Sequence, residues 1–198
     1  KEIVLQMKKR KKGSPGYLDY KKRMEILRAV IYFLIVAAII LLGYSQTHTK
    51  KNLLTVVGIV GCLPACKVLV GVITRWPYHS IAADKAKEIT QKASLLTLAF
   101  DLVVTSTEKI MPIECVVISG NKIFGYVSNS KVDLNYAAKH IKTILNQNQY
   151  EGLTVKLFDQ YSAFLARAEG LNNIQAIEKN DMKEYEEGIK NIILNISL

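Results

Sequence analysis

Few residues in this chain have the types and spacing that chemistry requires. Cys115 is a potential nucleophile, but a thiol needs a base beside it, and the sequence shows none nearby. Cys62 and Cys66 are four positions apart on one helix face, yet a metal site needs further ligands than these two. The chain has no glycine-rich phosphate loop and no serine-hydrolase or zinc-peptidase motif. Two acids in apolar segments, Asp101 and Glu114, remain as candidates.

The positive charge of the chain is concentrated in its N-terminal part. The 198 residues carry 27 Lys and Arg against 17 Asp and Glu, a net charge of +10. Residues 1–28 account for +7 and residues 29–80 for +4, whereas residues 81–198 sum to −1. A domain that binds DNA usually has a basic face, so nucleic acid is not expected as a partner. Three cysteines are too few for a disulfide framework and fit a reducing compartment.

Two apolar stretches predict a pair of transmembrane helices. Residues 29–44 carry no charge, and residues 53–74 carry only Lys67. With their flanks, helices at about residues 27–46 and 53–74 reach the roughly 20 residues that cross about 30 Å of hydrocarbon. A signal peptide is the alternative for the first stretch, but the apolar run is too long, lacks a small-residue cleavage site and precedes a second span.

Basic residues flank this hairpin on one side. Many more of them precede the first span than lie in the short loop between the spans, and others follow the second span. The positive-inside rule therefore predicts a multi-pass cell-membrane protein with both termini in the cytoplasm, and the composition favours a bacterial membrane. Lys67 lies toward the cytoplasmic half, where snorkelling lowers its cost. Trp76 and Tyr78 follow the second span, where an interfacial aromatic belt is expected.

Residues 1–28 are expected to form a basic juxtamembrane tail, with a flexible joint at residues 13–16. Basic side chains near a membrane surface attract anionic lipid by about 1 kcal/mol each. A plain topology signal is the alternative that explains the same charges. The side chains concerned are Lys8, Lys9, Arg10, Lys11, Lys12, Lys21, Lys22 and Arg23.

Small residues recur along the second span. Gly61 and Ala65 are four positions apart, and Gly58 precedes them, a spacing that permits close contact between helices. The pattern predicts packing against the first helix of the hairpin. Contact between copies of the chain, which would make a homo-oligomer, is the alternative.

Residues 80–198 predict a cytoplasmic mixed α/β domain, and 119 residues suffice for one core. Ser80 is expected to cap the first helix. The acidic run of Glu184, Glu186 and Glu187 is expected on a solvent-exposed helix face. The predicted elements are a helix at 80–93, strands at 95–106, 113–118 and 123–128 with a turn at 119–122, a helix at 135–147, a strand at 153–158, and helices at 162–170 and 182–195.

The two acids and this α-β-β-β-α-β order resemble the nuclease-related domain called NERD, within the restriction-endonuclease-like PD-(D/E)xK fold. The family has an Asp heading an apolar strand, a Glu-x-Lys about a dozen residues later, then a glycine turn and an Ile-aromatic-Gly strand. Here Asp101 precedes LVVTS, Glu114 precedes Cys-Val, and Gly120 opens GNKIFG. The resemblance covers roughly residues 80–160. It implies that the two acids bind Mg²⁺ and that a lysine orients or activates the attacking water.

The chain departs from the family pattern at two positions. Val116 replaces the lysine, and the family's glutamine would fall near Tyr136. Lys122 is a candidate for a migrated lysine on the adjacent strand. These departures indicate a pseudo-nuclease, although ordinary strand-edge acids would explain Asp101 and Glu114 equally well.

Three functions follow from these patterns. The first is a non-enzymatic membrane-anchored protein without a cofactor, which contacts the lipid bilayer and binds an unknown protein partner or assembles with copies of itself. The alternative is a membrane-tethered Mg²⁺-dependent nuclease, with Asp101 and Glu114 as metal ligands and Lys122 as the catalytic lysine. A transporter or channel subunit is a third hypothesis, weakened because the chain has only two spans and neither contains an acid.

Overall fold

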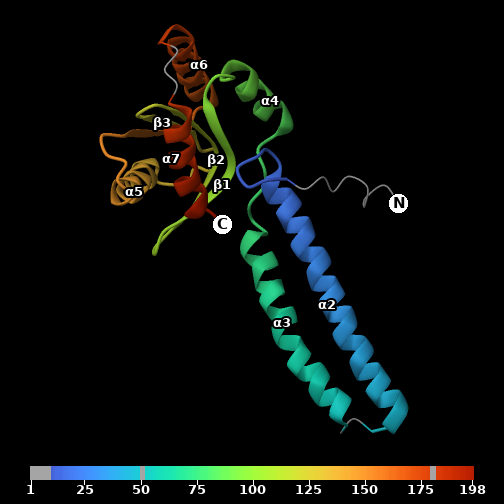
Figure 1. The fold of residues 1–198 in the computed structure, drawn as a ribbon. Helices are drawn as coiled ribbons and strands as arrows, with labels where there is room; N and C mark the ends of the chain where they lie inside the picture. Colours follow the sequence, from blue (N-terminus) through green and yellow to red (C-terminus); the bar gives the residue numbers. More distant parts are fainter. Residues whose placement is uncertain (1–9, 50–51, 179–181) are drawn as a thin grey trace. The chain divides into compact units, whose positions relative to one another are not determined.

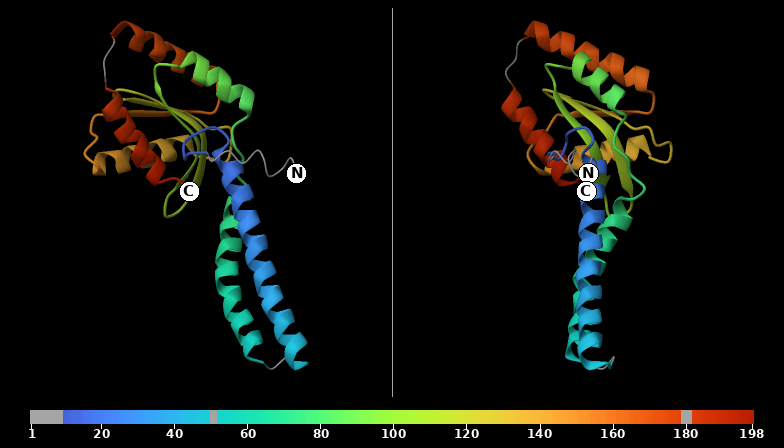
Figure 2. Two further views of the ribbon diagram at one scale, coloured as in Figure 1. Left: turned by 45° about the vertical axis from the view of Figure 1, so that its right-hand side comes forward. Right: turned by 90° about the vertical axis from the view of Figure 1, so that its right-hand side faces the viewer.

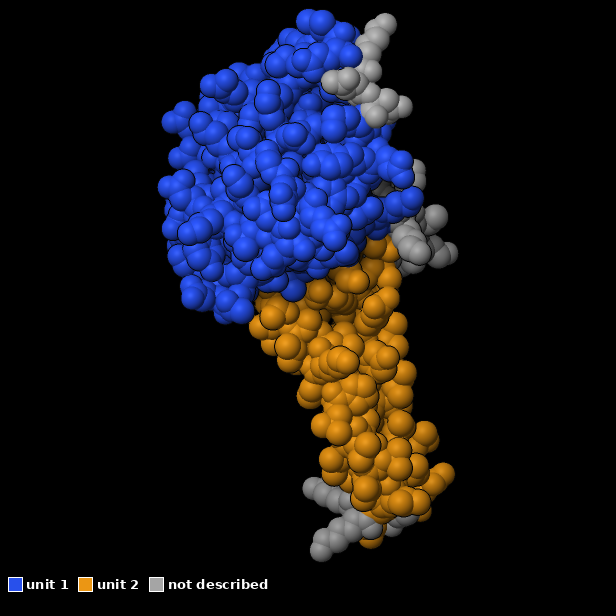
Figure 3. All heavy atoms as spheres, turned by 60° about the vertical axis from the view of Figure 1, so that its left-hand side comes forward, with its two compact units in different colours: residues 1–17, 80–198 blue, residues 18–79 orange. Residues whose placement is uncertain are grey.

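The computed structural model describes residues 10–49, 52–178 and 182–198, and the chain divides into two compact units. Leu18–His79 form one unit, and residues 80–198 form the other together with the segment that ends at Tyr17 (Figure 3). The predicted α/β class is confirmed, because two long apolar helices precede a mixed four-stranded sheet. Lys8 and Lys9, predicted to face lipid, lie outside the described residues.

Two long helices make up the first unit. Helix α2 is Tyr17–Thr47 and helix α3 is Leu53–Arg75. Both are long and apolar enough, by length and composition, to cross a membrane. Helix α2 begins ten residues earlier than predicted, because neither proline nor glycine interrupts the charged segment between Tyr17 and the predicted start. Gly16, with a φ of 80°, ends the turn that precedes the helix. The side chain of Asn52 caps α3 by accepting a 2.7 Å hydrogen bond from the amide of Thr55.

The small residues of α3 lie in the contact between the two helices. A Cβ atom added at Gly58 would stand 2.5 Å from Cγ1 of Ile40, and one at Gly61 would stand 3.3 Å from Cγ2 of Val36. Ala65, one turn further along, is fully buried. The structure thus places these three residues where α3 packs against α2 of the same chain.

The second unit is built on a four-stranded sheet with the order β1-β2-β3-β4. The first three strands form an antiparallel meander, and β4 pairs in parallel with β3. The strands are β1 (Thr97–Thr105), β2 (Ile110–Ser119), β3 (Lys122–Tyr126) and β4 (Thr154–Phe158). The turn predicted at residues 119–122 joins β2 to β3, as expected.

Helices cover both faces of this sheet (Figures 1 and 2). Their bounds are α4 (Ala83–Lys92), α5 (Leu134–Gln147), α6 (Tyr161–Glu178) and α7 (Lys183–Asn195). Helices α4 and α6 share one cluster of buried side chains with the sheet, and α5 and α7 share another. The predicted order of helix, three strands, helix, strand and further helices is therefore confirmed.

Three local predictions in this unit are wrong. Ser80 does not cap α4, which begins at Ala83 without a side-chain cap. Helix α6 continues past Gly170 to Glu178, because Ala168 and Leu171 on either side of the glycine are both buried in the α4–α6 cluster. The acidic run on α7 is not all exposed, because Glu186 is only 3% exposed.

Glu186 ties α7 to the sheet through its carboxylate. One oxygen accepts a 2.7 Å hydrogen bond from the hydroxyl of Thr97, and the other accepts a 2.7 Å bond from the amide of Gly120. A buried carboxylate is costly unless such bonds satisfy it. Glu186 therefore fixes both the start of β1 and the β2–β3 turn to one helix.

Two segments from opposite ends of the described chain cover the free edge of β1. The amide of Phe100 donates to the carbonyl of Gly13 at 2.9 Å. The amide of Val103 donates to the hydroxyl of Ser197 at 2.8 Å, and the amide of Leu198 donates to the carbonyl of Val103 at 3.0 Å. The basic segment before α2, which the sequence presents as a separate tail, thus packs onto the α/β domain. A covered edge cannot pair with a foreign strand.

Replacing Glu186 with Ala should lower the free energy of unfolding of the domain by about 2–4 kcal/mol, because the buried hydroxyl of Thr97 and the partly buried amide of Gly120 both lose their acceptor. Thermal unfolding of the full chain, followed by circular dichroism, measures this loss. Glu184→Ala, an exposed acid on the same helix, is the matched control and should change stability little. Equal stability of the two variants would contradict the role assigned to Glu186.

Candidate functional site

The structure brings the two predicted acids to facing positions on adjacent strands. The register of β1 and β2 pairs Phe100 with Cys115, and the next position along the ladder sets Asp101 across from Glu114. Asp101 is 2% exposed and has a φ of 56°, whereas Glu114 is partly exposed. A positive φ is uncommon for any residue other than glycine, so Asp101 interrupts the regular strand.

Side chains of both strands change sides of the sheet at this pair. In β1, Phe100 packs with α4 and α6, whereas Leu102, two positions later, packs with α5 and α7. In β2, Ile113 and Cys115 likewise belong to opposite clusters. Residues two apart in a regular strand face the same side. The acid pair therefore marks a reversal in the sheet.

This reversal determines which face of the sheet position 116 occupies, where the resemblance to NERD leads one to expect a lysine. Val116 is fully buried in the cluster with α5 and α7. Asp101 contacts the chain on the opposite face, because its partner Ile81 belongs to the cluster with α4 and α6. A lysine at position 116 would thus extend into the apolar core, away from that contact.

Each acid accepts a hydrogen bond from the protein. The amide of Ile81 donates to Oδ1 of Asp101 at 2.9 Å, which fixes the chain two residues before α4 begins. The hydroxyl of Ser128 donates to Oε1 of Glu114. Within the described part of the chain, no three His, Cys, Asp or Glu residues are grouped closely enough to hold a metal ion. Two carboxylates would leave most ligands of an Mg²⁺ ion to water.

Lys122 does not meet the acids. It pairs with Ser119 at the first position of β3, whereas Tyr126, four positions later, pairs with Cys115 beside Glu114. Four strand residues span about 13 Å. Lys122 therefore lies at the other end of the β2–β3 ladder, and the structure gives no support for it as a migrated lysine.

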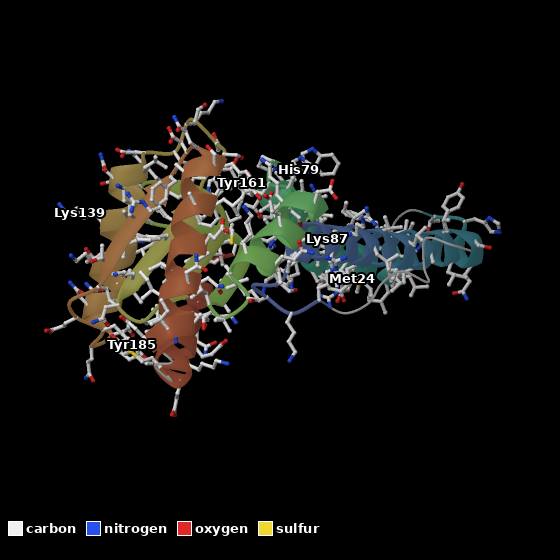
Figure 4. All side chains as sticks on the ribbon, turned by 90° about the horizontal axis from the view of Figure 1, so that it is seen from above. Met24, His79, Lys87, Lys139, Tyr161 and Tyr185 are labelled. Atoms are coloured by element: carbon white, nitrogen blue, oxygen red, sulfur yellow. The ribbon has the colours of Figure 1, made fainter. Side chains whose placement is uncertain are left out.

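Lys85, a partly buried cation on α4, was not among the site residues predicted from the sequence. Its Nζ atom donates to the hydroxyl of Tyr126 at 3.3 Å and lies 5.3 Å and 5.0 Å from the ring centres of Tyr126 and Tyr161. Figure 4 shows Tyr161 beside the green helix α4 that carries this lysine. Because Tyr126 belongs to the α4–α6 cluster, Lys85 is on the face where Ile81 contacts Asp101. Its only signal in the sequence is its place in the first turn of α4.

A carboxylate completes this group. The hydroxyl of Tyr161 donates to Oε2 of Glu88 at 2.7 Å. Burial, and then this hydrogen bond to Glu88, raise the pKa of Tyr161 well above its ordinary value. Lys85, Tyr126, Tyr161 and Glu88 thus join α4 to β3 and α6 through polar and aromatic contacts.

The basic residues expected to face lipid are divided between the two units. Arg10, Lys11 and Lys12 precede α2, and Lys12 donates to the carbonyl of Ser197 at 2.6 Å. Lys21, Lys22 and Arg23 lie in α2, where Arg23 is exposed. Lys22 donates to the carbonyls of Trp76 and Tyr78, at 3.4 Å and 3.2 Å. The side chains of Lys12 and Lys22 therefore bond to the protein itself.

Cys115 should react slowly with alkylating reagents in the folded protein. Burial raises the pKa of its thiol, and the nearby carboxylates of Asp101 and Glu114 raise it further, so the thiol stays protonated at neutral pH. Only the thiolate attacks. With N-ethylmaleimide at pH 7, peptide mass spectrometry should find Cys115 modified at least about 100-fold more slowly than after unfolding in guanidinium. Equal rates in the two states would show an accessible thiol instead.

On the α4–α6 face the chain thus presents a buried Asp101 bonded to a backbone amide, with a cation held between two tyrosine rings. Across the ladder, Glu114 is partly exposed and bonded to a serine. The two carboxylates expected from the sequence thus occupy facing strand positions, and position 116, where the resemblance leads one to expect a lysine, is a buried valine. No family model, curated protein or solved structure matches the chain.

Proposed function

We propose that the chain is a membrane-anchored, non-enzymatic binding protein. The observation that carries this proposal is the exposed apolar surface of α2 and α3, where Leu34 is 64% exposed and Leu63 is 71% exposed. Large contiguous apolar surfaces are rare on soluble proteins, whereas lipid stabilises them. Two antiparallel helices can cross the bilayer together, because the backbone N–H and C=O groups of each helix are hydrogen-bonded within that helix. The proposed location is the cell membrane, with both termini in the cytoplasm.

The α/β domain is, in this proposal, a NERD-like pseudo-nuclease. The α-β-β-β-α-β order and the facing positions of Asp101 and Glu114 support the resemblance to the restriction-endonuclease-like fold. The burial of Val116 and the bond from Ile81 to Asp101 support the loss of catalysis. The proposed partner is a protein or a second copy of the chain, bound without a cofactor.

One observation favours the nuclease alternative. Lys85 is a cation on the face where Asp101 is bonded to Ile81, and it replaces Lys122 as the candidate lysine. In that alternative, Asp101 and Glu114 would bind Mg²⁺ and Lys85 would stabilise negative charge on a phosphate. The nuclease alternative requires Asp101 and Glu114 to bind a metal ion, whereas the non-enzymatic binding protein does not. Metal binding therefore distinguishes the two functions.

Calorimetric titration of the full chain in detergent with Mg²⁺ or Mn²⁺ should show no saturable binding. Asp101 and Glu114 are engaged by the protein, and too few other ligands are present in the described residues. Glu114→Gln, which keeps the side-chain volume, is the control and should behave like the wild type. Saturable binding that disappears in this variant, with metal-dependent cleavage of DNA or RNA, would establish the nuclease alternative.

Reporter fusions should place both ends of the hairpin on the same side of the membrane. Green fluorescent protein joined after residue 198 should fluoresce, because that end is expected in the cytoplasm. Alkaline phosphatase inserted at His48, in the described part of the loop, should be active only if the loop lies outside. A dark fluorescent-protein fusion after residue 198 together with inactive phosphatase at His48 would reverse the proposed orientation.

A further inference from the structure

The contacts between α2 and α3 give the relative heights of residues along the hairpin. Gly58 lies against Ile40, Gly61 against Val36, and Gly71 against Glu25. Counting one residue for one along both helices from each contact places Lys67 opposite residues 29–31 of α2. Lys67 is therefore within about 5 Å of the height of Arg28, at 1.5 Å per residue.

Arg28 and Lys67 are the cations that border the charge-free part of the hairpin at the end away from the connecting loop. Both side chains are exposed, and neither makes a hydrogen bond or ion pair with any other described residue. Lys67 is two positions from Ala65, which faces α2, so it points away from the helix contact. From their height to the far end of the hairpin, residues 29–47 of α2 rise about 28 Å, close to the thickness of the hydrocarbon layer, and residues 53–66 of α3 rise about 21 Å, so the loop after α2 must cover the remaining depth on that side.

The helices continue beyond this height with a different kind of contact. Arg75 and Glu25 form a 2.9 Å ion pair, and their side chains are only 20% and 12% exposed. Lys22 donates to the carbonyls at the end of α3 and lies 5.9 Å from the ring centre of Trp76. Inside hydrocarbon, these charges and Arg23 would be costly, whereas in water they are ordinary helix–helix contacts. Their cost sets the exit of the helices from hydrocarbon, although Val70 and Ile73 of this part of α3 are exposed apolar side chains that suit the interface between lipid and water.

We propose that Arg28 and Lys67 bind the headgroup phosphates of the leaflet at that end of the hairpin and thereby set its depth in the membrane. Residues 17–28 of α2, about 18 Å of helix, then stand outside the hydrocarbon with the end of α3 as a paired stalk. Trp76 lies nine positions beyond Lys67, so it belongs to the stalk, not to the interfacial aromatic belt that its sequence position suggests. This inference rests on the proposed insertion of the hairpin.

The single tryptophan of the chain, Trp76, reports this depth. The full chain is reconstituted into vesicles of phosphatidylcholine and phosphatidylglycerol in a three-to-one ratio, with lipids brominated near the headgroup end of their chains. Wild-type Trp76 fluorescence should be quenched weakly. In the double variant Arg28→Leu/Lys67→Leu the apolar stretch lengthens and the hairpin should sink, so quenching should rise at least about twofold.

Two controls make the outcomes distinguishable. Arg28→Lys/Lys67→Arg keeps both cations and should quench like the wild type, while equal quenching in wild type and the leucine variant would overturn the phosphate anchor. Ile59→Trp in a Trp76→Phe background puts the reporter near the middle of the proposed span, at the height of residue 38 on α2 and on an exposed position, where lipids brominated deep in the chain should quench it strongly. Failure of that quenching would instead show that the hairpin does not insert, which would remove the proposed function itself.

Discussion

The α/β domain depends on one buried contact, the hydrogen bond from the amide of Ile81 to the carboxylate of Asp101. It holds Asp101 in a left-handed conformation inside a strand, which few residues other than glycine tolerate. At this point β1 and β2 exchange the faces of their side chains. Alternate side chains on the two sides of this point, such as Phe100 and Leu102, therefore pack in different core clusters, and the chain that enters α4 is fixed to the sheet. An aspartate at this position has a structural role, whether or not it once bound a metal.

Much of the architecture was predictable because it follows from local patterns. Long apolar stretches indicate helices such as α2 and α3, and the glycine turn around Gly120 separates two strands rich in apolar residues. The order of elements in the domain follows from the same periodicities. The start of α2 was missed because an apolar window detects the part of a helix that suits lipid and ignores its charged extension toward Tyr17.

The errors in the candidate site have a different cause. Glu186 and Lys85 read as surface charges because their partners come from distant segments, 66 positions away for Gly120 and 41 for Tyr126. The reversal at Asp101 breaks the period of two on which strand patterns rest, so Val116 could not be assigned to a face from the sequence. Lys122 was close in sequence to Glu114, but an antiparallel ladder brings together residues that are symmetric about the turn.

The cover on the edge of β1 has a consequence for how the domain forms during synthesis. Val103 and the Ser197 hydroxyl that accepts its amide hydrogen are 94 positions apart. At the usual pace of translation, roughly 5–20 residues per second, β1 waits some seconds for this partner after leaving the ribosome. The earlier segment at Gly13 is already available and can shield part of the edge. While the later half of the domain is still being made, this segment can therefore limit the pairing of β1 with strands of neighbouring chains.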